Sequence, residues 1–217
     1  MFAKLTTTAV LLALASPAAA VTVITNAPGA PDPGAPAGTT VVADFSNPLA
    51  PGVSNSTTGS VLTVAGTMPG QYAQPAPASP PDAYQAVQTG GASTFDFTKS
   101  LGVFSFYWGS IDTYNTLEFR RADGSLVQAF TGSAFAAPAN GNQSASATNR
   151  RVTFGFTGQE AVKKVVFKSS QNAFEYDTLA IAGIPEPTTW AMMILGFGLI
   201  GGAMRSRKTV TTKVAYA

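Results

Sequence analysis

The residues best suited to chemistry in this sequence are carboxylates and aromatic rings, because the chain contains no histidine and no cysteine. Glu175 and Asp177 lie two positions apart, so a strand would carry both on one face. Together with Asp44 from an early strand, they would supply the oxygen ligands that Ca²⁺ prefers. The pattern fits either two solvated strand charges, the interpretation we favour, or a structural calcium site, and apart from that structural Ca²⁺ we expect no cofactor.

A second group of residues has the side chains that bind sugars. Residues 104–119 are dense in aromatic and small polar side chains. In a glycan-binding interpretation, the rings of Tyr107, Trp108 and Tyr114 stack on sugar rings. Asp112 and Asn115 then bond to hydroxyl groups. The alternative is that the aromatic residues of this segment form core and its polar residues form a capped turn.

Catalysis has little support in the sequence. The lack of histidine and cysteine excludes Ser-His-Asp and Cys-His catalysis, thiolate or imidazole metal sites and disulfides. A secreted hydrolase acting on polysaccharide would need only two carboxylates, for which Asp112, Glu118, Glu175 and Asp177 are available, but no motif selects a pair. No phosphate-binding or dinucleotide motif is present, and basic residues occur as isolated pairs. We therefore expect neither an enzyme nor a nucleic-acid partner.

The N-terminal segment predicts export. Residues 1–20 combine one charge, Lys4, with an apolar run over 9–15 and small residues at 18–20. This is typical of a signal peptide, with Ala18 and Ala20 at the −3 and −1 positions and cleavage before Val21. The Sec translocon and signal peptidase are the expected partners.

The C-terminal segment has three parts, which are a proline-flanked glutamate, an apolar stretch and a basic cluster. They are Pro185-Glu186-Pro187, residues 190–204 beginning with Trp190, and residues 205–208 with Arg205, Arg207 and Lys208. The apolar stretch predicts a transmembrane helix with the basic cluster on the cytoplasmic side. Its length is about 22 Å at ~1.5 Å per residue, which is shorter than a typical hydrocarbon core of ~30 Å. Residues 209–217 form a short tail.

This arrangement resembles the PEP-CTERM sorting signal in its PEPxxWA variant, found in Gram-negative bacteria that make extracellular polysaccharide. The resemblance covers residues 185–208. It implies that an exosortase, an integral-membrane cysteine transpeptidase, recognises Pro185-Glu186-Pro187 and removes the tail. The protein would cross the inner membrane, hold its C-terminal helix there transiently or stably, and reach the cell surface or the medium. Without processing it would remain a single-pass membrane protein.

The resemblance also bears on the body of the protein. Residues 104–119 resemble a recurring strand–loop–strand of PEP-CTERM surface proteins, which are similar to carbohydrate-binding β-sandwiches. We therefore expect a structural or glycan-binding role, with extracellular polysaccharide as a partner.

The body itself is predicted as mainly β. Short runs with period-two alternation, bounded by turn residues, fill residues 40–184 and favour an antiparallel β-sandwich of jelly-roll type, after a Pro/Gly-rich linker over 21–39. Asp123-Gly124 predicts a hairpin turn. The ten expected strands are 40–45, 60–65, 83–89, 93–97, 101–108, 114–120, 125–130, 150–156, 163–168 and 173–181.

The net charge depends on which part of the chain is counted. The whole chain carries +2, from 13 Lys and Arg against 11 Asp and Glu. Five basic residues lie in the targeting segments and the tail, whereas every acid lies between positions 21 and 187. The exported part therefore has eight basic residues against eleven acids, a net charge of −3, and an anionic partner gains no support from the overall charge.

Overall fold

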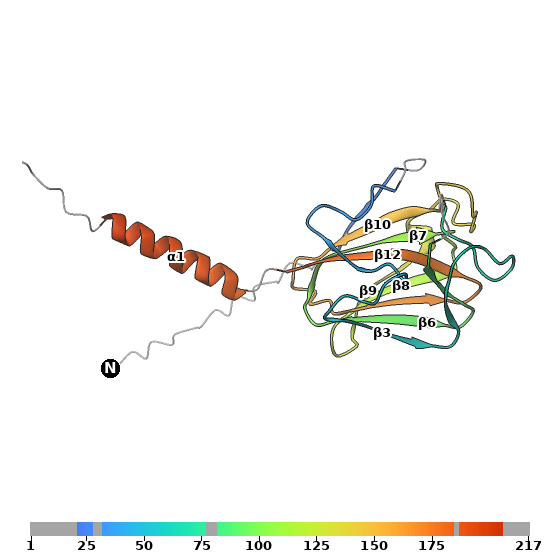
Figure 1. Ribbon diagram of the computed structural model, residues 1–217, viewed down its shortest axis with the longest axis horizontal. Helices are drawn as coiled ribbons and strands as arrows, with labels where there is room; N and C mark the ends of the chain where they lie inside the picture. Colours follow the sequence, from blue (N-terminus) through green and yellow to red (C-terminus); the bar gives the residue numbers. More distant parts are fainter. Residues whose placement is uncertain (1–20, 28–31, 77–81, 185–186, 206–217) are drawn as a thin grey trace, which may run out of the picture.

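The computed structural model describes residues 21–27, 32–76, 82–184 and 187–205. The predicted signal peptide over 1–20 and the tail over 209–217 lie outside these residues. Two antiparallel β-sheets face one another, and one α-helix of the described residues, α1, lies beyond them (Figure 1). The predicted two-sheet architecture is therefore present, while the jelly-roll type stays a prediction.

The larger sheet has seven strands in the order β1-β10-β7-β12-β5-β4, with β2 also paired to β12. Its strands are β1 (Thr22–Thr25), β2 (Thr40–Ala43), β4 (Val61–Val64), β5 (Tyr84–Val87), β7 (Leu101–Gly109), β10 (Arg150–Gly155) and β12 (Phe174–Gly183). The smaller sheet has the order β3-β6-β11-β8-β9. Its strands are β3 (Val53–Thr58), β6 (Ala92–Phe97), β8 (Asn115–Arg120), β9 (Leu126–Thr131) and β11 (Lys164–Ser169).

All ten predicted strands are present, each within two residues of its expected bounds. The Asp123-Gly124 turn is also confirmed, with Gly124 at φ +86° and its N–H donating to the Arg121 carbonyl. A short 3₁₀ turn, Gly132–Ala134, follows β9.

Two strands were not predicted. β1 lies inside the expected linker over 21–39, so that prediction is wrong for Thr22–Thr25, which pair with β10 along their whole length. β3 has a polar sequence without apolar alternation, and it is an edge strand held by pairing with β6. Both depend on backbone pairing rather than on burial of their own side chains, a property that apolar periodicity does not report.

The core lies between the sheets and is mainly aromatic. Phe104, Phe106 and Trp108 alternate along β7 and are completely buried, as are Phe154 of β10 and Phe167 of β11. Trp108 stacks on Phe174 of β12, with ring centroids 4.4 Å apart. The interpretation of the 104–108 aromatics as core is therefore confirmed.

β12 lies inside the larger sheet and carries the chain to the C-terminal segment. It pairs with β7 on one side and with β5 and β2 on the other. Its pairing with β7 extends to Gly183, opposite Leu101, and the Ile184 N–H then donates to the Ser100 carbonyl at 3.2 Å. The sheet therefore holds the chain up to the residue that precedes Pro185.

α1 (Pro187–Arg205) begins after two intervening residues, 185 and 186. Proline suits the first position of a helix, where its missing N–H costs no hydrogen bond, so the helix begins three residues before the expected 190. Among the helices in the described ranges, none is long and apolar enough to span a bilayer, so the predicted transmembrane helix is not confirmed.

Candidate functional site

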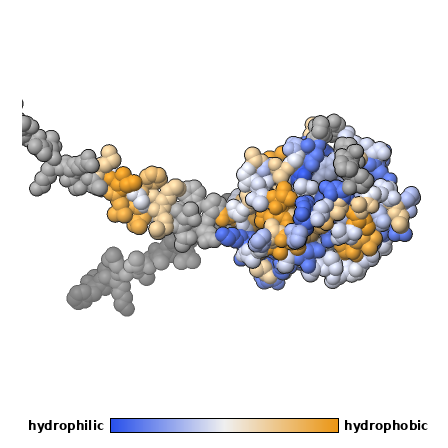
Figure 2. Space-filling view, in the orientation of Figure 1, coloured by the Kyte–Doolittle hydropathy of each residue, from blue (hydrophilic) through white to orange (hydrophobic). Residues whose placement is uncertain are grey.

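The C-terminal segment presents an apolar surface. Its large apolar side chains between Met192 and Met204 have exposed fractions of 44% to 70%, whereas the sandwich core is almost fully buried. Apolar side chains are exposed along the helix from Met192 onward, and Figure 2 shows much of this part of the surface as hydrophobic. Such a surface requires a membrane or an apolar partner.

The predicted sorting residues are only partly within the described structure. Pro187 and Trp190 belong to the first turn of α1, and Arg205 is its last residue, exposed at the end where a cation is favourable. Pro185, Glu186, Arg207 and Lys208 lie outside the described residues, as do Ala18 and Ala20 of the predicted cleavage site. Val21, the expected first residue of the mature chain, packs against the core directly before β1.

The predicted glycan-binding set is divided by the structure. Trp108 is completely buried between the sheets, so it cannot stack on a sugar. Asn115 is also completely buried, where its Oδ1 accepts the Asp112 N–H at 2.9 Å and its Nδ2 donates to the Ala173 carbonyl at 3.0 Å. The first bond closes the turn between β7 and β8, and the second ties this turn to the residue before β12. This is the structural alternative for Asn115.

Asp112 and Tyr114 remain partly accessible in this turn. The Tyr114 hydroxyl donates to the Asn172 carbonyl at 2.8 Å, which ties the ring to the β11–β12 turn. Partial burial raises the pKa of Asp112, and the nearby Tyr114 hydroxyl partly offsets this. Tyr114 is therefore the accessible aromatic residue of the original set.

The predicted calcium ligands are not assembled either. Asp177 lies near Asp44 and Asp82, and burial, with a smaller contribution from these two charges, raises its pKa to about 6. Asp44 is itself occupied, since its carboxylate accepts bonds from the Asn47 N–H and side-chain amide. Within the described ranges, no three Asp, Glu, His or Cys residues lie close enough together to hold a metal ion.

Glu175 is held in a different environment on the same strand. Its carboxylate accepts the Ala73 N–H at 2.9 Å and the Ser110 hydroxyl at 2.8 Å, and only 3% of the residue is exposed. Burial raises the pKa of Glu175 to about 7, although the two hydrogen bonds favour the ionised form and partly offset this rise. The loop around Ala73 covers this part of the larger sheet, and no pattern in the loop sequence indicated that role.

The carboxylates considered for a hydrolase are spread over the molecule. Glu118 faces outward from the smaller sheet, where Lys168 and Arg120 each lie 2.7 Å from one of its oxygens. Burial alone would raise its pKa, but these two partners outweigh burial and lower it. Glu175 and Asp177 belong to the larger sheet, beyond a core about 10 Å thick. Asp112 lies close enough to Glu175 for its charge to add to the raised pKa of Glu175.

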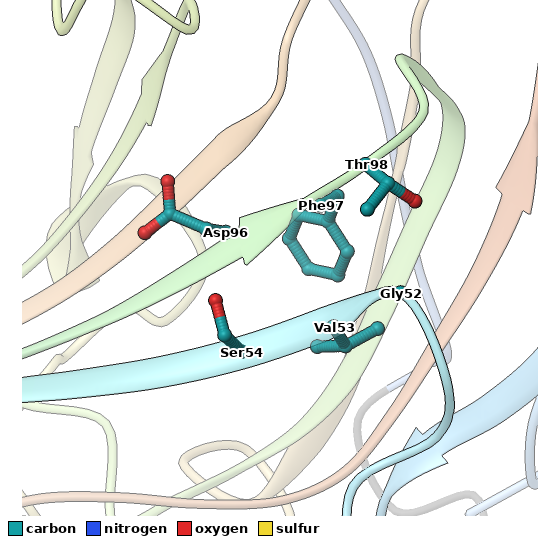
Figure 3. Close-up of a pocket in the computed structure, with 6 residues that line it drawn as sticks. All are labelled: Gly52, Val53, Ser54, Asp96, Phe97 and Thr98. Carbon is teal, nitrogen blue, oxygen red and sulfur yellow. The ribbon is translucent and has the colours of Figure 1, made fainter.

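A small hollow lies at the edge where β3 pairs with β6 (Figure 3). Its volume is about 280 Å³, and Ser54 lies opposite Asp96 in the strand register. The Asp96 carboxylate is already paired with Lys164. This hollow therefore offers a ligand the hydroxyl groups of Ser54 and Thr98 and no unpaired charge.

Comparison with known proteins assigns the C-terminal segment. Residues 183–208 match the PEP-CTERM protein-sorting motif, which confirms the predicted resemblance over this part of the chain. The motif implies an exported protein that is sorted and processed by an exosortase. No curated protein matches the chain closely enough to count as a relative.

Proposed function

We propose that the chain is exported cargo of an exosortase, processed at Pro185-Glu186-Pro187, whose β-sandwich is delivered to the cell surface or the extracellular matrix. The observation that carries this proposal is the junction at Ile184. The sheet ends there, the recognition tripeptide follows at the next residue, and the exposed apolar helix begins within that tripeptide. Removal of everything after the junction would leave all twelve strands in place.

The N-terminal end supports a matching maturation by the Sec translocon and signal peptidase. Val21 packs against the core and Thr22 starts β1. A chain that begins at Val21 would therefore keep its first strand, and cleavage six residues later, after Asn26, would remove it. Arg150, whose guanidinium bonds to the Thr25 hydroxyl and to the Asn26 and Phe135 carbonyls, would then keep only the bond to Phe135.

For the sandwich we propose a non-catalytic role, either structural or glycan-binding. Trp108 and Asn115 are buried, so a glycan site would have to be built around Tyr114 and neighbouring hydroxyl groups. A secreted hydrolase acting on matrix polysaccharide is the alternative prediction, with Asp112 and Glu175 as the neighbouring carboxylates.

Mass spectrometry of the protein isolated from its own host tests the sorting proposal. We expect a mature C-terminus near residues 185–187 and an N-terminus at Val21. Glu186→Ala should preserve an intact Ala217, while Asp123→Ala, which removes an exposed carboxylate from a turn far along the chain, should leave processing unchanged. An intact Ala217 in the unaltered protein would instead support the unprocessed membrane form.

A further inference from the structure

The outer face of the smaller sheet carries a row of side chains that the strand register places side by side. Thr58 of β3 lies opposite Ala92 of β6, Ala92 opposite Lys168 of β11, and Lys168 opposite Thr116 of β8. Cross-strand partners on one face lie about 5 Å apart, so the row crosses four strands.

The surface is hollowed along this row, with a volume of about 590 Å³. Three turns complete its wall, at Gly90-Gly91, Thr113-Tyr114 and Ser169-Ser170. The hydroxyl-bearing residues Thr58, Thr113 and Ser170 are exposed here. A hollow of this size is within the range that holds small-molecule ligands, and its many hydroxyl groups match a ligand that is itself rich in hydroxyl groups.

One aromatic ring lines the hollow. Tyr114 is fixed by the bond from its hydroxyl to the Asn172 carbonyl, so its ring needs little further ordering when a ligand binds. An amphipathic ring beside hydroxyl groups is suited to the apolar face of a sugar.

The charge at the hollow is positive, although the exported chain is negative overall. Lys168 is the charged residue of the lining, which contains no carboxylate. Beneath it, Glu118 is shared between Lys168 and Arg120, so two cations meet one carboxylate. The lowered pKa of Glu118 keeps that carboxylate ionised at neutral pH, so Lys168, Arg120 and Glu118 together carry one positive charge, while the Asp112 carboxylate interacts with Tyr114 from outside the lining.

We propose that this hollow binds an acidic saccharide unit, a uronic acid residue of a polysaccharide chain, with its carboxylate at Lys168 and its ring against Tyr114. The inference rests on the proposed glycan-binding role and adds the position of the site and the chemical class of the ligand. Of the original glycan set, Tyr114 lines the hollow, whereas Trp108, Asp112 and Asn115 do not.

Affinity electrophoresis of the full-length chain in mild detergent tests the proposal. The probes are polygalacturonate, neutral dextran and inorganic polyphosphate. We expect retardation by polygalacturonate, at least tenfold weaker binding for Lys168→Gln and for Tyr114→Ala, and retained binding for Lys168→Arg. Arg121→Gln removes the same charge from an exposed turn outside the hollow and should stay within twofold of the unaltered protein.

The possible failures are distinguishable. Equal binding of polyphosphate, or equal weakening by Arg121→Gln, would show general attraction of anions and overturn the assignment. Binding of dextran that is unaffected by Lys168→Gln would also overturn it, while leaving a glycan-binding role in place. Retardation by none of the polysaccharides would overturn both the assignment and the glycan-binding role.

Discussion

The rings of Phe167 and Tyr176 lie parallel across the sandwich, 3.8 Å apart between centroids and inclined by 13°. Phe167 comes from the smaller sheet and Tyr176 from the larger one, and both are completely buried. The Tyr176 hydroxyl donates to the Gln85 side chain, which also accepts from Ser93. This stack joins the two sheets near the centre of the core, and a polar network fixes one of its rings.

Replacement of Phe167 by alanine should lower the free energy of unfolding by about 3–5 kcal/mol, because it opens a cavity between the sheets. Urea unfolding followed by the fluorescence of buried Trp108 measures the change. Phe197→Ala is the matched control, since that ring is 70% exposed on α1 and its loss should leave the midpoint unchanged. Equal effects of the two substitutions would contradict the assignment of Phe167 to the core.

The raised pKa values of Glu175 and Asp177, to about 7 and about 6, predict a stability that falls as pH rises. Their ordinary values are 4.5 and 3.8, so between these values and neutrality the folded state keeps protons that the unfolded state has released. The stabilisation is complete below about pH 4 and is lost as pH approaches and passes 7. Melting temperatures measured from pH 5 to 7.5 should therefore decrease.

Glu175→Gln should flatten this decrease, removing roughly 1–3 kcal/mol of pH-dependent free energy. Glu118→Gln is the control, because the lowered pKa of Glu118 places its titration below this pH range. An unchanged slope in the Glu175 variant would refute its assigned titration.

The ion pair between Arg151 and Asp32 should contribute far more to the free energy of unfolding than the pair between Lys164 and Asp96. The Arg151 side chain is only 2% exposed and bonds to both oxygens of Asp32, whereas the other pair is 27% and 38% exposed. Asp32→Ala leaves a buried cation without its partner and should cost roughly 3 kcal/mol. Asp96→Ala should cost at most about 1 kcal/mol, as is usual at a surface. Urea titration of both variants makes the comparison.

Truncation after Ile184 should leave the melting temperature of the sandwich within about 2 °C, because the apolar side chains of α1 are exposed rather than packed on the sheets. Truncation after Thr178 should abolish folding, since it removes Leu179–Gly183 from the middle of the larger sheet together with the pairing to β2. Circular dichroism of the two fragments checks this. A large loss of stability in the first fragment would reveal an unrecognised contribution from α1.

The sequence predicted the fold where burial dictates alternation. β7 and β10 place Phe104, Phe106, Phe154 and their neighbours on one face, and such strands are visible without a structure. β1 and β3 were missed because they are edge strands with exposed or polar side chains, whose position is set by a partner strand distant in sequence.

The candidate site was harder to predict, for a related reason. Residue type suggested Trp108 and Asn115 as ligand-binding residues. In the structure Trp108 is buried in the core, and Asn115 is buried where it closes a turn. The sequence did not single out Lys168, because its cross-strand neighbours Ala92 and Thr116 come from strands that are distant in sequence. The sorting motif could be predicted from the sequence, because its three parts follow one another along the chain.

The central position of β12 has a mechanical consequence for a protein tethered by its C-terminus. Fluid drag on the sandwich would pull on the end of β12, along the strand direction. The hydrogen bonds to β7 and β5 are perpendicular to that direction, so the force would load many of them at once instead of peeling them one by one. An edge strand pulled in the same direction would be held by one neighbouring strand, whereas β12 is held on both sides.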